Sequence, residues 1–307
     1  MRNLTPTLKS ACRRGLAVLC LGGCALAAPT FAASGKPLLT GGVGSIDGAG
    51  GGGLTPWALT GSYGASGEIG VTAFATRVHL RDHRLDVHGV AWAWDERLEL
   101  SFARQDFDTR ATGTALGLPG LRLKQDIIAF KLRLAGDAIL DPDRWQPQWA
   151  LGVEHKSLDA DGLAPTLRAL GADTSGTDVY LSATKLLLAQ GVLVNATLRA
   201  TRANQNGLLG HGGSGQRHYS LQPEFSLAWL LNRRLAIGAE YRTKPDKLNP
   251  SPLGDGLRED DWWDLFVAWA PSKHASLTVA YVDLGRIVPA VQPRRQTGAY
   301  LSLQLAF

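Results

Sequence analysis

Apolar and polar residues alternate along most of this chain with a period of two. In the last ten residues, GAYLSLQLAF, every second position from Ala299 to Phe307 is apolar, and most intervening positions are polar. The stretches HYSLQPEFSLAWLL, DWWDLFVAW, NATLRAT and IIAFKLRL repeat the pattern. A period of two is that of a β-strand with one apolar face. The runs are nearer the roughly 9–11 residues of a tilted membrane-crossing strand than the roughly 5–6 of a soluble sandwich.

The alternation predicts an all-β protein, a single transmembrane antiparallel β-barrel. No segment after the N-terminal leader approaches the roughly 20 apolar residues of a membrane-spanning helix, so a closed barrel is the alternative that satisfies the backbone in lipid. Thirteen strands are predicted, at 57–64, 68–80, 83–94, 97–107, 122–135, 145–158, 177–188, 191–205, 217–231, 234–247, 260–270, 274–284 and 297–307.

Thirteen is an odd number of strands, whereas bacterial outer-membrane barrels usually have an even number and both termini in the periplasm. Their periplasmic turns are short and their outer loops long, so the lengths of the connections show how the thirteen runs should be interpreted. Counting back from a periplasmic Phe307, the outer connections are long and most periplasmic ones are short. The exceptions are the periplasmic piece 136–144 and the outer turn at 81–82. The predicted strand at 57–64 would then run from the outer side to the periplasm, so another strand has to precede it. The candidate is KPLLTGGVGSIDG, whose alternating pattern is weak. We therefore expect about fourteen strands, with twelve as the alternative if one run is a loop.

Aromatic residues gather near the ends of the predicted strands, where membrane barrels carry interfacial girdles. The predicted girdle consists of Trp94, Trp145, Trp229, Trp263, Trp269 and Phe307. An alternating last strand that ends on an aromatic residue also looks like the signal through which outer-membrane barrels bind the barrel assembly machinery.

The first 33 residues read as a cleaved signal peptide, since four basic residues precede an apolar run with small residues at its end. An uncleaved anchor or a lipidated Cys24 are the alternatives. All three cysteines lie in this leader, so disulfides do not hold the remaining chain together. Without the leader, 28 basic and 27 acidic residues leave a charge of +1, which argues against a nucleic-acid partner. The domain prediction is a signal peptide at 1–33, a Gly-rich segment at 34–56 and the barrel at 57–307.

The stretch GAGGGG at Gly48–Gly53 matches the letters of a dinucleotide-binding loop. That site needs a strand before it and a helix after it, whereas Pro56 and an alternating run follow here. We therefore interpret the stretch as the outermost first bend of the barrel or a flexible piece near its seam, and predict no cofactor.

If the apolar faces meet lipid, charged side chains of both signs face the lumen. The predicted pore-lining residues are Arg77, Lys131, Arg133, Glu154, Lys156, Arg199, Glu224, Glu240, Arg242, Lys244 and Asp264, with Glu99 beside them. Glu224 and Arg242 are expected on neighbouring strands, where pairing offsets the cost of confinement. The lumen is either a wet pore for small solutes or a packed polar interior.

The outer loops are unusually apolar for solvent-facing segments, as in GTALGLPGLRL, GLAPTLRALGA, NQNGLLGHGG and RIVPAVQP. Three arrangements are open: a packed lid, loops folded into the lumen, or a site that admits apolar solutes.

Two groups of residues offer the parts of an enzyme or metal site: His79, His83 and His88 in one predicted hairpin, and the pair Asp260 and Asp261 at the outer rim. The histidine spacings do not place all three on one strand face, and no nucleophile motif accompanies them. We predict no catalytic residues and no metal. A non-conducting structural or adhesive barrel is the other alternative.

The segments GAGGGGLTPW, ALGLPGLRLKQD, ATRANQNGLLG, LGDGLREDDWWDLFVAWAP and AYVDLGRIVPAVQPRRQTGAYLS resemble a family of uncharacterised, porin-like outer-membrane β-barrels, catalogued as a domain of unknown function. The resemblance implies an outer-membrane location in a Gram-negative bacterium, with contacts to membrane lipid. It brings no substrate and no catalytic residue. A channel for small solutes, including apolar or amphipathic ones gated by the outer loops, is the function we expect.

Overall fold

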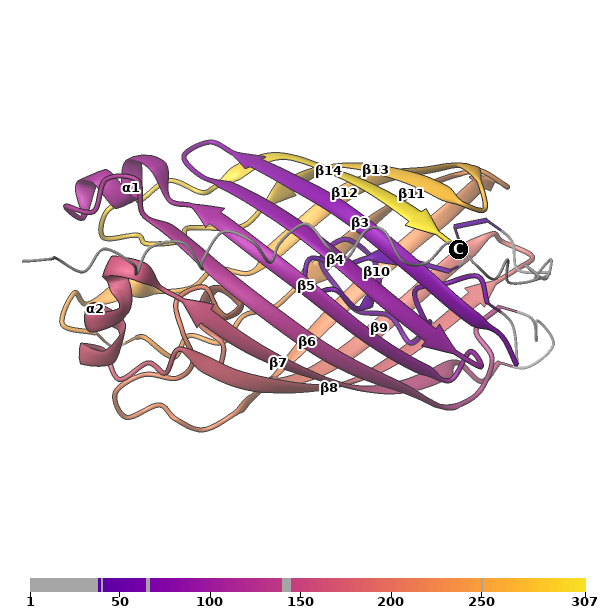
Figure 1. Cartoon of the computed structure of the whole chain (residues 1–307), viewed down its shortest axis with the longest axis horizontal. Helices are drawn as coiled ribbons and strands as arrows, with labels where there is room; N and C mark the ends of the chain where they lie inside the picture. Colours follow the sequence, from indigo (N-terminus) through magenta and orange to yellow (C-terminus); the bar gives the residue numbers. More distant parts are fainter. Residues whose placement is uncertain (1–37, 40, 65–66, 140–144, 250) are drawn as a thin grey trace, which may run out of the picture. The chain divides into compact units, whose positions relative to one another are not determined.

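The computed structural model describes residues 38–39, 41–64, 67–139, 145–249 and 251–307, and these residues contain a closed antiparallel barrel of twelve strands (Figure 1). The wall consists of β3 (Ile69–Leu80), β4 (Arg84–Trp94), β5 (Leu98–Asp108), β6 (Arg122–Ala135), β7 (Gln148–Asp159), β8 (Ser175–Leu187), β9 (Val192–Thr201), β10 (Ser220–Asn232), β11 (Leu235–Arg242), β12 (Trp262–Ser272), β13 (Ala275–Asp283) and β14 (Thr297–Ala306). The ring closes where β14 pairs with β3, with Leu301 opposite Arg77. No wall strand is therefore left with an unpaired edge.

Twelve of the thirteen predicted runs are wall strands, so the twelve-stranded alternative is correct and the expectation of fourteen is wrong. The exception is the run at 57–64, which lies inside the barrel with Trp57, Ala58 and Leu59 buried. The alternation at 57–64 predicted a wall strand, but both faces of this run are covered inside the barrel, whereas a wall strand exposes one face to lipid. The signal peptide predicted at 1–33 lies outside the described residues.

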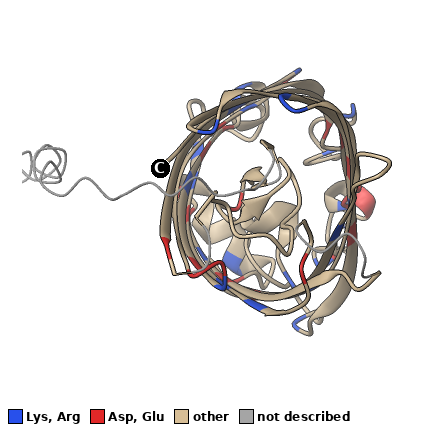
Figure 2. Ribbon diagram, turned by 90° about the vertical axis from the view of Figure 1, so that its right-hand side faces the viewer, with Lys and Arg blue, Asp and Glu red and all other residues tan. Residues whose placement is uncertain are grey.

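The described residues between 38 and 64 form a plug inside the barrel, and Figure 2 shows this chain within the ring of strands. Two short strands, β1 (Val43–Gly44) and β2 (Gly50–Gly51), pair with each other and not with the wall. The ends of the plug lie close together, since the Leu39 amide donates to the Tyr63 hydroxyl at 2.9 Å. The predicted bend at GAGGGG is therefore corrected: the stretch belongs to an internal hairpin.

The long connections gather at one end of the barrel, and they carry its short helices (Figure 1). These helices are α1 (Arg110–Ala115), η1 (Asp161–Leu163), α2 (Ala164–Ala169), η2 (Asn204–Gly207) and η3 (Asp255–Leu257). Phe307 lies at the other end, where its backbone pairs with Val71. Because outer-membrane barrels have long outer loops and short periplasmic turns, the loop end corresponds to the outer end and the short-turn end to the periplasmic one. None of the described helices has the length and apolarity to cross a membrane.

The apolar loop residues pack against one another as part of a buried cluster. The buried members are Leu121, Leu163, Leu167, Leu208, Leu209, Leu257, Ile287 and Val288. Of the three arrangements open from the sequence, the loops therefore pack together. In part they also fold into the lumen, because Asn206 of the loop at 202–212 accepts hydrogen bonds from the inward-facing Gln125 and Lys156.

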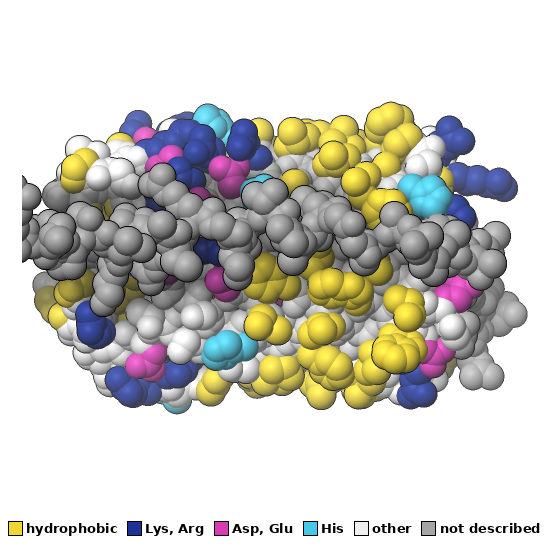
Figure 3. Space-filling view, viewed as in Figure 1, with side chains coloured by type: hydrophobic (Ala, Val, Ile, Leu, Met, Phe, Trp, Pro, Cys, Tyr) yellow, Lys and Arg dark blue, Asp and Glu magenta, His cyan; other side chains and the backbone are white. Residues whose placement is uncertain are grey.

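Outward-facing side chains form an apolar band over the periplasmic part of the wall, which Figure 3 shows as a yellow zone. Phe102, Phe130, Phe225, Leu265 and Leu301 are each at least 38% exposed. In water this surface would be an aggregation liability, whereas a bilayer stabilises it. Charged side chains replace the band towards the outer end of β3–β6, where Arg77 pairs with Asp86 and Arg122 with Asp106.

Candidate functional site

A cluster of seven charged side chains joins the plug to the barrel wall, and we call it the central cluster. Its members are Asp47, Glu154, Lys156, Asp178, Arg199, Glu224 and Arg242. Asp47 belongs to the plug, and the other six project inward from β7 to β11. Each of the seven side chains is at most 4% exposed. Burial of this many charges is tolerable only where each has close partners of opposite sign.

The six wall members pair among themselves. Arg199 Nη1 lies 2.5 Å from Glu154 Oε2, and Arg199 Nε lies 2.6 Å from Glu224 Oε1. Arg242 Nε lies 3.2 Å from the same Glu224 oxygen, which confirms the predicted neighbouring pair. Three wall cations thus meet three wall carboxylates, since Lys156 Nζ lies 3.0 Å from Asp178 Oδ2.

Asp47 is a fourth carboxylate seated on this set. Arg242 Nη1 donates to its Oδ2 at 2.8 Å. Arg199 Nη2 lies 3.7 Å from Oδ2, and Lys156 Nζ lies 3.5 Å from Oδ1. The plug therefore contributes a carboxylate to a pocket formed by three cations from three different strands.

Asn206 connects an outer loop to the same cluster. Its side-chain amide donates to Asp47 Oδ1 at 2.6 Å, while its own oxygen accepts from Lys156 Nζ at 2.6 Å and from Arg242 Nη2 at 2.9 Å. Asn206 has a positive φ of 60°, a conformation that asparagine tolerates better than most residues. The side chain of Asn206 thus links the plug to the loop at 202–212.

A second anchor holds the glycine stretch of the plug. Glu99 accepts hydrogen bonds from the amides of Gly50 at 2.9 Å and Gly61 at 2.6 Å. Lys131 lies 3.1 Å from Glu99 and donates to the carbonyls of Gly50 at 2.6 Å and Leu59 at 2.8 Å. One buried ion pair therefore satisfies polar backbone groups on two branches of the plug.

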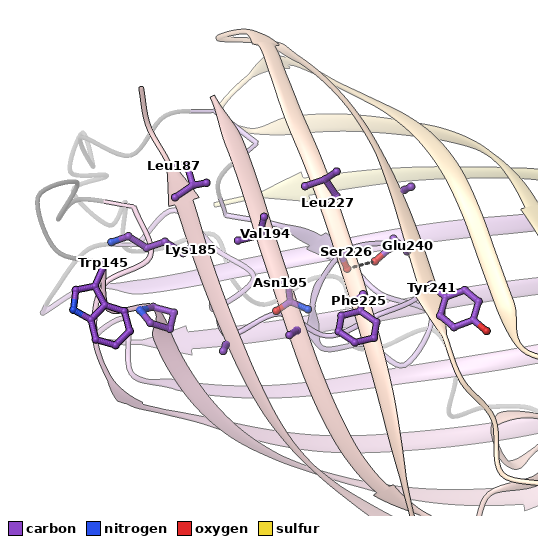
Figure 4. Close-up of a pocket in the computed structure, with 14 residues that line it drawn as sticks. Trp145, Lys185, Leu187, Val194, Asn195, Phe225, Ser226, Leu227, Glu240 and Tyr241 are labelled. Atoms are coloured by element: carbon purple, nitrogen blue, oxygen red, sulfur yellow. Dashed lines mark hydrogen bonds between the residues drawn. The ribbon is translucent and has the colours of Figure 1, made fainter. Parts of the chain in front are cut away.

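A third anchor is Glu240, which accepts from the Leu54 amide at 2.7 Å and from the Thr55 hydroxyl at 2.5 Å. Ser226 also donates to Glu240 at 3.0 Å, as the dashed line in Figure 4 marks. Asp264 lies directly across from Glu240 in the β11–β12 register, so two carboxyl groups face the lumen side by side.

The opposite face of this wall region carries an apolar groove of about 690 Å³. Figure 4 shows Phe225, Leu227 and Tyr241 along it, together with Trp145 and Leu187. Phe225 and Leu227 alternate with the inward-facing Ser226 along β10, and Tyr241 follows the inward-facing Glu240 on β11, so these three side chains face lipid.

The consecutive glycines are required by how closely the plug packs against the wall and against itself. A Cβ at Gly52 would overlap the Glu240 carboxylate, and one at Gly51 would overlap the Thr55 carbonyl. Gly48 has a φ of +95°, in the left-handed region that favours glycine. The stretch thus serves tight packing inside a barrel.

The predicted lumen residues face the interior with one exception. Those that do are Lys131, Arg133, Glu154, Lys156, Arg199, Glu224, Glu240, Arg242, Lys244 and Asp264. Lys244 follows β11 and lies 2.9 Å from Glu259 and 3.9 Å from the ring centre of Trp262. Arg77 is the correction: it points outward, 63% exposed, because the inward positions of β3 are the even-numbered ones such as Thr76.

The residues weighed for an enzyme or metal site are dispersed. His79 and His88 face outward, whereas His83 is buried, stacks on Phe107 and lies 3.0 Å from both Gln296 and Thr112. Burial lowers the pKa of His83. Across the described part of the chain, no group of three His, Cys, Asp or Glu residues is placed to hold a metal.

The two rim aspartates have separate structural partners. Asp260 accepts from Arg286 Nε and Nη2, both at 2.7 Å, and these hydrogen bonds lower its pKa to about 2. Asp261 accepts from the Tyr241 hydroxyl and, at 3.0 Å, from the Lys244 amide.

The predicted aromatic girdle residues lie on the outward face of the barrel. Trp94, Trp145, Trp229, Trp269 and Phe307 are each at least 48% exposed, and Trp263 is half-buried. Trp262, one position earlier than Trp263, is buried inside the barrel.

Sequence reasoning missed Asp47, Asp178 and Asn206. Asp178 carries a signal, since it occupies a polar position of the alternating run DVYLSAT. Asp47 and Asn206 have no such periodicity, because they lie in irregular segments whose position depends on the barrel around them.

The fold is that of porin-like outer-membrane β-barrels, in agreement with the predicted fold class. Among solved structures, the chain is similar to the NanC porin at 7% identity and a TM-score of 0.50, over 76% of this chain and 98% of that one. It is also similar to the KdgM porin, at 9% identity and 0.47, over 77% and 99%. The Salmonella typhi outer membrane phospholipase matches at 9% and 0.42, over 82% and 93%. At these identities the likeness concerns the fold alone.

The chain belongs to the family described as "Protein of unknown function (DUF3034)", whose profile matches residues 40–304. This membership confirms the resemblance to an uncharacterised family that the sequence indicated. The comparison with curated proteins found no match.

Proposed function

We propose that this protein is an outer-membrane channel for small solutes that is closed in the present conformation and opens when the plug leaves its anchors. The observation that carries the proposal is the plug itself, a segment held inside a closed barrel by side-chain anchors. Its strands pair only with each other, so its departure breaks no hydrogen bond of the wall ladder.

The charges of the central cluster support a removable plug. The wall contributes three cations and three carboxylates, so it stays balanced when Asp47 departs. With Asp47 seated, the cluster holds one carboxylate more than its cations. Because each unbalanced buried charge is costly, the plug is the member of the cluster that leaves most easily.

The wall that the plug covers has two different sides. Inward residues of β3 and β4 are largely apolar, among them Val78, Leu85 and Val87. The charged strands β9 and β10 are five or six places away from β3 and β4 in the ring of twelve, so they lie across the lumen. An opened lumen with one apolar and one charged side suits amphipathic solutes.

A non-conducting barrel is the second candidate, and the burial of the central cluster favours it. Lys156 and Glu154 are 0% exposed, so water does not reach this charged side of the lumen in the present conformation.

Gly52→Val separates the two candidates, because the added side chain would overlap Glu240 and prevent the plug from seating. We expect wild-type protein in a planar bilayer to conduct rarely, and Gly52→Val to conduct at least about tenfold more often. The control is Gly162→Ala in an outer loop, whose Cβ would meet only the flexible Leu118 side chain at 3.1 Å. A folded Gly52→Val protein that never conducts would establish the non-conducting barrel.

A further inference from the structure

The seat of Asp47 has the composition of a carboxylate-binding site. It combines a guanidinium donor, Arg242, with the charges of Arg199 and Lys156 and the amide of Asn206. Guanidinium and amide donors arranged around one carboxylate are the usual means by which proteins bind carboxylate ligands. The bound carboxylate, that of Asp47, belongs to the plug and not to a strand of the wall.

The part of the plug around Asp47 resembles a small organic acid, in that one carboxylate lies next to one apolar group. The residue lies in a tight turn in which the Ser45 amide donates to the Ala49 carbonyl at 3.0 Å and the Gly48 amide donates to the Ser45 carbonyl at 2.9 Å. Its neighbour Ile46 is 1% exposed, with its carbonyl oxygen accepting from Gln105 at 2.8 Å. The tip of the turn thus places one carboxylate beside one branched apolar side chain.

The donors around Asp47 remain in place without it. Arg199 and Arg242 are oriented by Glu224, and Lys156 is held by Asp178. Arg199 also lies 5.1 Å from the ring centre of Tyr180. Because these partners belong to the wall, the seat is preorganised for whichever carboxylate fills it.

We propose that the seat of Asp47 is a binding site for the carboxylate of small organic acids with an apolar body, and that such a solute opens the channel by displacing Asp47. This inference rests on the proposed function, since it assumes a plug that leaves and a lumen that conducts. Displacement exchanges one carboxylate for another on the same donors, so the hydrogen bonds that Arg242 and Asn206 donate to Asp47 are replaced and not lost. The solute's apolar body takes the place of Ile46 and then meets the apolar side of the lumen.

The test uses full-length protein in planar bilayers with benzoate, the uncharged benzamide and the cationic benzylamine as probes. Millimolar benzoate is expected to raise the open probability of the wild-type protein at least about fivefold, whereas benzamide and benzylamine leave it unchanged. In Asp47→Asn, which preserves side-chain size, the channel is expected to open without benzoate and to respond to it no further.

A second measurement tests the site itself in the open channel. In the Gly52→Val background, the reversal potential is expected to show benzoate passing several-fold more easily than benzylamine. Adding Arg242→Gln is expected to abolish this preference, and adding the outward-facing Arg77→Gln is expected to preserve it. Folding of each variant is checked by the change of gel mobility on boiling.

The outcomes distinguish the two proposals. If Gly52→Val and Asp47→Asn conduct but benzoate neither opens the wild-type channel nor passes preferentially, the carboxylate site is refuted and the channel stands. If both variants fold and neither conducts, the channel is refuted and the carboxylate site with it.

Discussion

At the scale of single residues, the contribution of a charged side chain to stability depends more on whether it points into the lumen or outward than on the sign of its charge. Arg77 and Lys131 are both basic residues on alternating strands, and the sequence placed both in the lumen. In the structure, Arg77 forms an exposed pair with Asp86, whereas Lys131 is 1% exposed and holds Glu99 and two plug carbonyls. Exposed pairs contribute about 0–1 kcal/mol, while breaking a buried pair costs about 3–5 kcal/mol.

Lys131→Met is therefore expected to lower the free energy of unfolding by about 3 kcal/mol or more, because Glu99 stays buried without its partner. Arg77→Met is the matched control and is expected to change it by less than about 1 kcal/mol. Urea titration of the folded band on gels measures both. Equal effects of the two substitutions would contradict the difference in burial described above.

At the scale of elements, the outer loop at 202–212 is the most consequential irregular segment after the plug. It carries Asn206 into the central cluster, and its His211 pairs by backbone hydrogen bonds with Asp173 on the neighbouring loop, at 3.0 and 2.8 Å. The His211 side chain is 0% exposed, packed so closely on Gly176 that a Cβ there would overlap the ring.

This loop is expected to loosen as the pH falls. Burial lowers the pKa of His211 to about 4, and Lys156 and Arg202 add to that effect while Asp178 opposes it. Since this value lies below the ordinary 6.5, the folded loop is at full stability above about pH 6.5 and loses stability as the pH falls towards 4, by about 3 kcal/mol in all. Hydrogen exchange of residues 204–210 should accelerate over this range.

His211→Phe keeps a ring of similar size in the packed position and removes the titration. Exchange in this variant should be nearly independent of pH between 6.5 and 4, apart from the intrinsic chemistry of exchange. A loop that loosens equally in the wild-type protein and in His211→Phe would assign the effect to another group.

At the scale of the whole molecule, closure of the wall governs stability. Every wall strand has two neighbours, and the pairing of β14 with β3 joins the last ten residues of the chain to the first wall strand. The native barrel should therefore resist detergent at room temperature and migrate faster on a gel than the boiled protein. An unheated band at the position of the boiled protein would contradict a closed barrel.

The sequence by itself determined the wall of this protein. An alternation of period two over long runs and the lengths of the connections were enough to identify the barrel and twelve of its strands, because each wall residue faces either lipid or lumen and its chemistry records which. The same rule placed ten of the eleven predicted lumen residues, and it failed at Arg77 because outward residues near the outer end lie beyond the lipid and are free to be charged.

Only the tertiary structure decided what fills the barrel. GAGGGG, Asp47 and Asn206 have no periodic environment, since their neighbours come from strands far away in the sequence, such as Glu240 for Gly52 and Arg242 for Asp47. The glycines record only that something lies very close to the backbone. The closed ring shows that the Glu99–Lys131 pair and the Glu240 carboxylate lie there.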